Sequence, residues 1–206
     1  MNLEEVERIA KRMMGVVDEK DELRERALKE TRDIIKACRE TISALHDNKL
    51  DIKAIEGAKA KLKTLKDSLR DHGDILYSGY ILGAAQELTE AFLFYRYMSG
   101  EEPPQPEELG VEATEYLLGL CDFTGELRRH MLCALIKNDL EGAERDCKAI
   151  ERIYKTLAPA DYPRGLINLK QKVDACRAIM EKSLEDLARA KQSSELTRLL
   201  SERSSS

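Results

Sequence analysis

The most constraining feature of the sequence is the placement of its prolines. All five lie in two short segments, SGEEPPQPEELG (residues 99–110) and LAPADYPRG (residues 157–165). Proline is unfavourable inside helices. Outside these two segments apolar residues recur with helical periodicity, and no segment alternates convincingly at period two. The chain is therefore predicted to be all-α. Because short connections between long helices favour antiparallel neighbours, we expect a bundle of about seven mostly antiparallel helices.

These helices are expected to form one domain over residues 1–190. The first should end near Gly15, and the Asp47-Asn48 pair should end the second. The serine-rich residues 191–206 are expected to fray. The predicted helices cover about residues 2–14, 18–46, 51–70, 75–98, 111–137, 139–157 and 165–190 or beyond.

Composition narrows the class of protein. The 206 residues include Lys+Arg 34 and Asp+Glu 39, and the net charge of -5 excludes a globally basic nucleic-acid protein but not a local basic surface. No apolar stretch is long enough for a transmembrane helix, and the acidic N-terminus does not resemble a secretory signal. Five cysteines without a CxxC pair favour neither a disulfide framework nor a zinc site. We therefore expect a cytoplasmic protein with reduced thiols and no membrane contact.

Two carboxylates stand out in the segment 75–98, which is otherwise apolar nearly all round and therefore belongs at the centre of a bundle. Glu87 and Glu90 lie three residues apart at its middle, on one helix face. Burying unpaired carboxylates is costly, so these two require a cation, protons or basic partners. Gly79 and Gly83 on the same stripe predict close approach of a second helix.

The segment 111–137 has a matching stripe of Glu115, Gly119, Asp122 and Glu126. If the two helices face each other, the carboxylates of Glu87, Glu90, Asp122 and Glu126 converge. Oxygen donors without histidine favour Mg²⁺ or Mn²⁺ over zinc. The alternative is that the acids form ion pairs with the nearby Arg96, Arg128 and Arg129, and the residues alone favour neither interpretation.

Two basic stripes accompany the acids. Arg26, Lys29, Arg32, Lys36 and Arg39 lie opposite the apolar face of the helix at 18–46. Lys59, Lys63, Lys66 and Arg70, followed by His72, recur at helical spacing in the next helix. Such stripes are most often solvated helix faces. Because no aromatic residues are interleaved with them, any nucleic-acid contact should be through phosphates and should be salt-sensitive.

Four segments of the sequence resemble the translin/TRAX family, and the match is roughly collinear over most of the chain. The segments are RERALKETRDIIKACRETISALH (24–46), GAAQELTEA (83–91), EYLLGLCDFTGELRR (115–129) and LKQKVDACRAIMEKSLEDL (169–187). The two acidic segments are similar to TRAX, the catalytic branch. The compact connection over residues 100–110 is similar to that of archaeal members, which assemble without a separate translin partner.

The resemblance implies an all-α protein that assembles into a hollow octamer and binds single-stranded RNA and DNA. TRAX-like subunits are Mg²⁺-dependent endoribonucleases, in which a metal-activated water attacks the phosphodiester. The implied catalytic and metal-binding residues are Glu87, Glu90 and Asp122, with Glu126 as a further ligand, an orienting residue or a general base. The family's basic helix falls on Arg26, Lys29, Arg32 and Arg39.

Two other functions remain open at this stage. One is a non-catalytic, translin-like oligomer that binds single-stranded RNA or DNA, alone or with a partner subunit. The other is an all-α nucleotide pyrophosphohydrolase, which also uses acids on helices with Mg²⁺. The basic stripes and the DFTGEL segment favour the endoribonuclease.

Overall fold

The computed structural model describes residues 2–204, and this part of the chain contains eight helices and no strand. The predicted all-α fold is therefore confirmed. The helices are α1 (Leu3–His46), α2 (Lys53–Ser68), α3 (Gly73–Leu76), α4 (Gly79–Ser99), α5 (Pro106–Leu109), α6 (Ala113–Ile136), α7 (Leu140–Leu157) and α8 (Leu169–Ser204).

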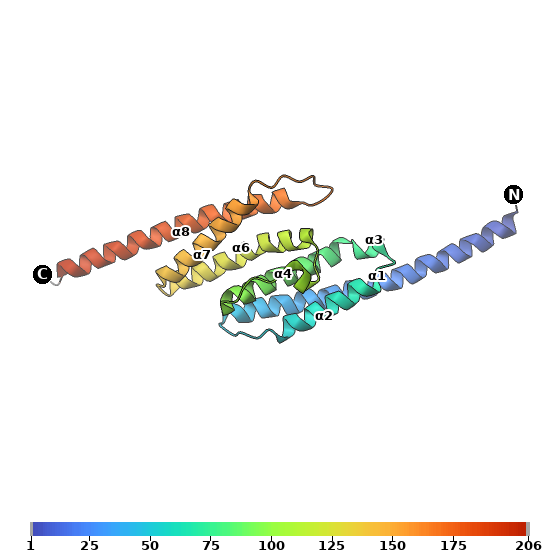
Figure 1. Ribbon diagram of the computed structural model, residues 1–206, viewed down its shortest axis with the longest axis horizontal. Coiled ribbons are helices and arrows are strands. Elements are labelled where there is room, and N and C mark those ends of the chain that lie inside the picture. The colour runs from blue at the N-terminus through green and yellow to red at the C-terminus, as the bar shows by residue number, and fades with distance from the viewer. Residues whose placement is uncertain (1, 205–206) are drawn as a thin grey trace.

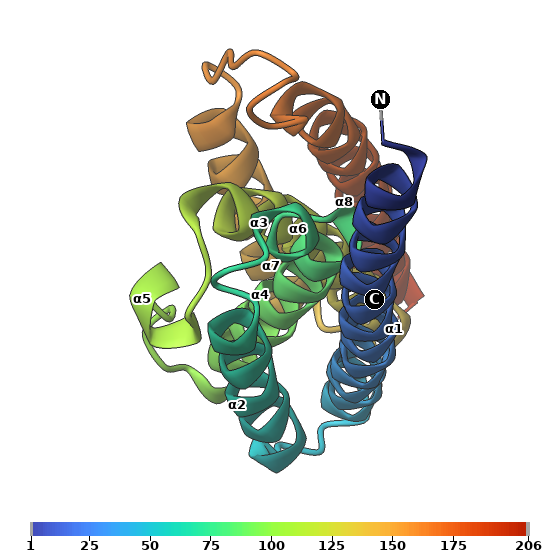
Figure 2. The ribbon, with the colours of Figure 1, turned by 90° about the vertical axis from the view of Figure 1, so that its right-hand side faces the viewer.

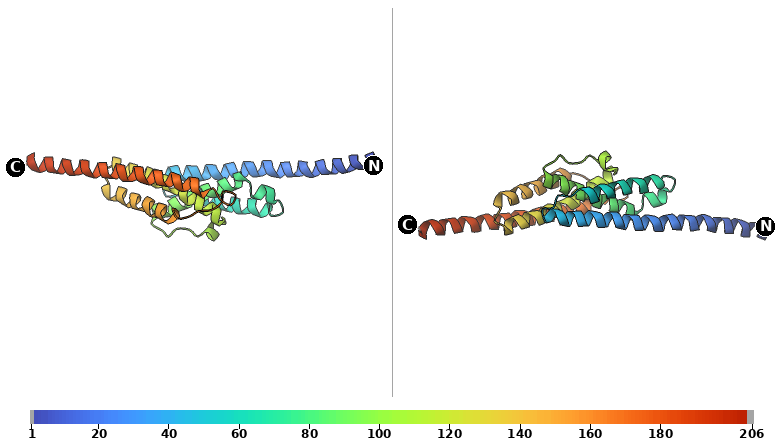
Figure 3. Two further views of the ribbon diagram at one scale, coloured as in Figure 1. Left: turned by 90° about the horizontal axis from the view of Figure 1, so that it is seen from above. Right: turned by 90° about the horizontal axis from the view of Figure 1, so that it is seen from below.

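Helices α4 and α6 pack against each other at the centre of the molecule (Figure 1). Helices α1 and α2 cover α4, and α7 and α8 cover α6. Seen end-on and from above, α1 and α8 run along one side, whereas α2, α5 and α7 lie on the other (Figures 2 and 3). The N-terminal part of α1 and the C-terminal part of α8 project beyond the core in opposite directions (Figure 3).

The central position of α4 follows from its sequence, because apolar side chains surround most of this helix. Its buried residues include Ile81, Leu88, Phe92 and Phe94. The close approach of α6 is made possible by Gly119. A methyl group there would lie 2.6 Å from Thr89 Cβ and 2.7 Å from the backbone oxygen of Gln86, closer than real contacts allow.

The prediction that Gly79 and Gly83 mark the close approach of a second helix is wrong. Gly79 and Gly83 have no atom of another element within 4 Å of the place that a Cβ would take. The close contact between α4 and α6 therefore depends on the glycine of α6, and α4 meets it with the larger Thr89.

The structure also corrects the first helix boundary. The two segments predicted as separate helices, 2–14 and 18–46, form the single helix α1, which begins at Leu3. Asn2 caps it, because its side chain accepts hydrogen bonds from the backbone of Glu4 and Glu5. An isolated glycine inside a helix costs only about 1 kcal/mol relative to alanine, so Gly15 between strong helix formers does not end it. Burial in α1 begins only at Ala27.

Other helix boundaries also differ from the predicted ones. The predicted helix at 75–98 is divided at Tyr77 and Ser78 into α3 and α4, and the proline segment contains the short α5, with Pro106 at its first position, where proline is tolerated. Helix α8 begins at Leu169 and not at residue 165, and it reaches Ser204, an extension that the predicted range allowed. Ion pairs of Arg198 with Glu195 and Glu202 support this last part. Residues 205 and 206 lie outside the described residues.

None of the helices within residues 2–204 has both the length and the apolar character needed to cross a bilayer. The five cysteines are free thiols, and Cys133 is the one that is only half-buried.

Candidate active site between the central helices

Helices α4 and α6 bring the predicted acids together. Glu87 and Glu90 from α4 and Asp122 from α6 line one cavity of about 380 Å³. Glu126 lies one turn further along α6, close enough to Glu90 for its charge to act on that carboxyl group. The other residues that line the cavity are Cys121 and Gly125 of α6 and Lys172, Ala175 and Ile179 of α8.

Three of the four acids are held by cationic or imidazole partners. Arg39 of α1 donates from Nη2 to Oε1 of Glu87 at 2.7 Å and from Nε to Oε2 at 3.3 Å. Lys172 of α8 donates to both carboxylate oxygens of Asp122, at 2.5 and 2.8 Å. Two more contacts hold Glu126, from His46 Nε2 at 2.5 Å and from Arg129 Nη1 at 3.8 Å. The outer helices thus provide a cation on each side of the acid cluster.

The arginines that sequence proximity suggested as partners mostly bind elsewhere. Arg96 pairs with Glu101 and Glu108 beyond the end of α4. Arg128 reaches Ser183 and Asp186 of α8. Only Arg129, at 3.8 Å from Glu126, approaches an acid of the cluster.

Glu90 differs from the other three acids because its carboxyl group has no hydrogen bond or ion pair with any residue of the described range 2–204. Burial raises its pKa to about 8, and the negative charges of Asp122, Glu126 and Glu87 add to the effect, against a smaller opposing effect of Lys172. The negative charges of the cluster also act on Cys38 of α1, whose pKa is raised to about 12 by burial and by Glu87 and Glu90. The cavity therefore favours added positive charge or a proton at Glu90.

The chemistry of the cavity fits a hard divalent cation, although the side chains are not yet arranged around one. Within residues 2–204, no three carboxylate, imidazole or thiol groups stand ready to hold a metal ion. The donors are all carboxylate oxygens, which Mg²⁺ and Mn²⁺ prefer. The Arg39 side chain is 69% exposed and that of Lys172 is 36% exposed, so both can turn away from Glu87 and Asp122 toward solvent. A divalent ion would take the place of these two cations.

The basic stripe of α1 leads to this cavity. Lys29 and Arg32 are exposed and have no ion-pair partner between residues 2 and 204, whereas Arg26 and Lys36 lie 4.0 and 3.8 Å from glutamates one turn along the same helix. Arg39 is the last member of the stripe and the one that contacts the acid cluster. The exposed basic face of α1 therefore ends at Arg39, next to Glu87 of the cavity.

The basic stripe of α2 presents less charge to solvent than the sequence suggested. The Lys66 ammonium group lies 2.6 Å from Glu115 and 3.2 Å from the backbone oxygen of Gly110, and its side chain is only 18% exposed. Glu115 also caps the first turn of α6, where it accepts from the backbone of Glu112 at 2.8 Å. Lys66 thus joins α2 to α6 and does not present its charge to solvent.

The remaining residues of this stripe have separate surroundings. Lys59 lies over the ring of Phe92 at 5.2 Å, a cation–π contact. Lys63 and Arg70 are exposed, and Arg70 pairs with Asp67 one turn away. His72 is half-buried at the start of α3. Because Lys66, Lys59 and Arg70 all have partners within the molecule, the α2 stripe presents less free charge to solvent than the α1 stripe does. Helix α2 packs against α1, as Figure 2 shows.

Sequence reasoning missed Lys172 and His46 as parts of the cluster. Lys172 is 50 positions from Asp122, and His46 is 80 positions from Glu126. Neither position breaks a hydrophobic pattern, so only the packing of α8 and α1 against α6 reveals them. The sole sequence signal for Lys172 was its place in the segment 169–187.

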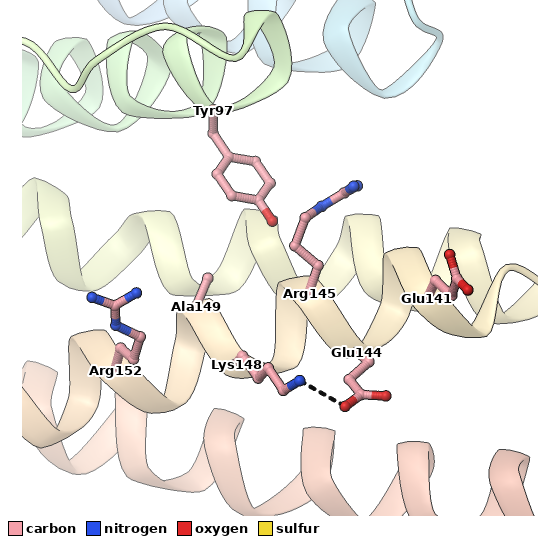
Figure 4. Close-up of a pocket in the computed structure, with 7 residues that line it drawn as sticks. All are labelled: Tyr97, Glu141, Glu144, Arg145, Lys148, Ala149 and Arg152. Atoms are coloured by element: carbon pink, nitrogen blue, oxygen red, sulfur yellow. Dashed lines mark ion pairs between the residues drawn. The ribbon is translucent and has the colours of Figure 1, made fainter.

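A larger cavity, of about 620 Å³, lies between α4 and α7 (Figure 4). Tyr97 points into it from α4, with Arg145 and Arg152 on α7. The Tyr97 hydroxyl donates to the buried Asp146 at 2.5 Å, and Asp146 also contacts His130 Nδ1 at 2.6 Å. This satisfied network joins α4, α6 and α7 and lacks the converging acids of the smaller cavity.

Comparisons with known proteins agree with this architecture. A model of the translin family matches residues 22–188. A protein of Methanocaldococcus jannaschii, itself uncharacterised, is 32% identical over 180 residues, which cover 85% of this chain and 79% of the relative.

Solved structures are similar over nearly the same range. The crystal structure of AfC3PO has a TM-score of 0.79 and 28% identity, and the match covers 89% of this chain and 97% of that one. The complex of AfC3PO with duplex RNA has a TM-score of 0.73 at the same identity and coverage. The crystal structure of apo-NeC3PO has a TM-score of 0.77 and 24% identity over 88% of this chain and 96% of that one, which bears on the fold alone.

Proposed function

This chain belongs to the translin family, and on that premise we propose that it is a metal-dependent endoribonuclease that cleaves single-stranded RNA within a closed oligomer. The observation that carries the proposal is the meeting of three carboxylates in one cavity between α4 and α6, with Glu126 one turn further along α6, next to the basic face of α1. The similarity to AfC3PO, which has been solved with duplex RNA, supports RNA as the ligand.

The basic face of α1 binds the RNA backbone. Lys29 and Arg32 are exposed and unpaired with any acid among the described residues, so they can neutralise phosphates without losing an internal partner. Arg39 lies between this face and the cavity. A phosphate that reaches Arg39 competes with Glu87 for the guanidinium group, and the exchange leaves the Glu87 carboxylate open. RNA binding thus prepares the acid cluster.

Glu87, Glu90 and Asp122 are the residues that would hold Mg²⁺ or Mn²⁺, which supplies charge neutralisation at the phosphate and a water of lowered pKa. Glu90, whose raised pKa keeps it protonated at neutral pH, would have to give up that proton to act as a ligand. Lys172, freed from Asp122, remains in the cavity as a donor for a phosphate oxygen. Glu126 is fixed by His46 and serves as the proton acceptor for the attacking water.

The test is cleavage of end-labelled RNA by the purified protein, with Mg²⁺ and with chelator. Single-stranded and duplex RNA are compared, because the related complex contains a duplex. Glu87→Gln, Glu90→Gln and Asp122→Asn should each lower cleavage on the order of 100-fold or more. The control is Glu141→Gln, which removes an acid from the cavity between α4 and α7 and should cleave normally. Unimpaired cleavage by the three cavity variants would remove the assignment.

One observation favours a second candidate, a non-catalytic RNA-binding oligomer. Three of the acids already have a partner, and no group in residues 2–204 is ready to hold a metal. This function predicts salt-sensitive RNA binding that chelator does not change, with intact RNA recovered after incubation with Mg²⁺. The same assay therefore separates the two functions.

We also propose self-association into a closed octamer, alone or with a translin-like partner subunit. The first turns of α1 expose Leu3, Val6, Ile9, Met13 and Val17 between 43% and 66%. These side chains recur along one projecting helix, and a second copy of the chain would cover them. Light scattering should give the mass of an octamer, and Ile9→Glu with Met13→Glu should lower it.

A further inference from the structure

Cys121 and Cys176 face each other across the contact between α6 and α8. Their residues are 2% and 1% exposed. The Cys176 thiol donates to the backbone oxygen of Cys121 at 3.5 Å, and the two cysteines belong to one buried cluster between α6 and α8. The hydroxyl of Thr124 also donates to Cys176 Sγ at 3.5 Å. Two cysteines that pack together on neighbouring helices, one thiol against the backbone of the other residue, meet the first requirement for a disulfide, which is proximity.

The pair also lies directly behind the acidic cavity. Cys121 lines that cavity and precedes Asp122, and Cys176 follows Lys172 by one helical turn. The two thiols therefore flank the ion pair between Lys172 and Asp122. The cavity gives a small oxidant a route to Cys121 that a closed core would not.

The other three cysteines lack these features. Cys38 lies in the core between α1 and α4, and Cys147 packs with Met131 in a separate cluster. Cys133 is half-buried on α6. None of the three lines the acidic cavity.

We infer that Cys121 and Cys176 are a redox pair that closes to a disulfide between α6 and α8 and thereby controls the acidic cavity. With hydrogen peroxide as the oxidant, one thiolate attacks the O–O bond, which gives a sulfenic acid and releases hydroxide. The second thiol then attacks the sulfenic sulfur, a disulfide forms and water leaves. In total two thiols lose two electrons, and one peroxide is reduced to two waters.

The closed bond changes the wall of the cavity. A disulfide holds its sulfurs about 2.05 Å apart, so it would tie α8 to α6 next to Asp122 and one helical turn from Lys172. The consequence for RNA cleavage rests on the proposed function. Oxidation is expected to slow cleavage severalfold, and dithiothreitol should restore it.

The first experiment counts thiols in the full chain after treatment with hydrogen peroxide, by maleimide labelling under denaturing conditions and mass spectrometry. The wild type should fall from five labelled thiols to three, with a peptide that links Cys121 to Cys176. Cys176→Ser should lose no pair of thiols, whereas the control Cys147→Ser should lose two. Five remaining thiols, a link between chains, or a link to another cysteine would overturn the inference.

The second experiment measures Mg²⁺-dependent RNA cleavage by the same samples. Cys176→Ser should cleave like the reduced wild type before and after peroxide. Equal cleavage by the reduced and the disulfide-linked wild type would overturn control of the cavity. If the reduced wild type cleaves no RNA, the proposed function fails, and the thiol count still decides whether the pair forms.

Discussion

Glu90 is the acid of the cavity without a partner within residues 2–204, so its ionisation should be visible in the stability of the protein. In the unfolded chain the pKa of this carboxyl group is about 4.5, and in the folded protein burial and the neighbouring acids raise it to about 8. A group with a raised folded pKa keeps its proton in the folded state while the unfolded chain loses it. Stability is therefore unaffected below pH 4.5 and falls as the pH rises toward 8.

The size of the effect follows from the same two values. Each pH unit between them costs about 1.4 kcal/mol of unfolding free energy. At pH 7 the interval from 4.5 is two and a half units, which gives an upper value of about 3 kcal/mol. Because the Glu90 side chain keeps some contact with solvent, the measured cost should be about 1–3 kcal/mol. Glu90→Gln has nearly the same shape and does not ionise, so it should remove this cost.

The assay is urea unfolding in chelator at pH 5 and pH 8, at one fixed protein concentration. Glu90→Gln should be close to the wild type at pH 5 and more stable at pH 8, with the control Glu141→Gln unchanged at both. Mg²⁺ at pH 8 should stabilise the wild type and leave Glu90→Gln nearly unaffected. A constant difference between wild type and Glu90→Gln across this range would refute the reasoning.

Three further predictions address packing and RNA binding. Gly119→Ala should cost about 1–3 kcal/mol of stability because its methyl group meets α4. Gly125→Ala on the same helix, with open space around it, should be neutral or slightly stabilising, and thermal unfolding of the two variants tests the difference. Lys66→Ala should cost about 2–4 kcal/mol because it leaves Glu115 buried and unpaired, and RNA affinity per folded protein, measured by anisotropy, should hardly change. Arg32→Ala should leave stability unchanged and lower the slope of log affinity for single-stranded RNA against log salt by about 0.7, as a salt titration would show.

The arrangement of the central helices could be predicted from the sequence because helical periodicity fixes which residues share a face. Glu87 and Glu90 had to lie on one face of α4, and Asp122 and Glu126 on one face of α6. The same reasoning failed for Gly79 and Gly83, because a glycine shows where a helix can approach and not where one does.

The partners of the acids could not be predicted in this way. Lys172 and His46 belong to amphipathic helices in which many polar positions look alike, and which of them points inward depends on the rotation and register of α8 and α1. Lys66 shows the reverse case. Its stripe looked like a solvated face, yet the start of α6 covers it. Periodicity describes one helix at a time, whereas an ion pair between helices depends on both.

The balance of charge in the cavity explains why RNA and a divalent cation should bind together. With Arg39 on Glu87, Lys172 on Asp122, and a proton on Glu90 at neutral pH, little uncompensated charge remains to attract a metal. A divalent ion must therefore displace two side-chain cations and a proton, and it binds more tightly where those cations have another anion to contact. In the proposed function, RNA phosphates are that anion for Arg39. Since linkage is reciprocal, the metal must strengthen RNA binding by the same factor that RNA strengthens metal binding.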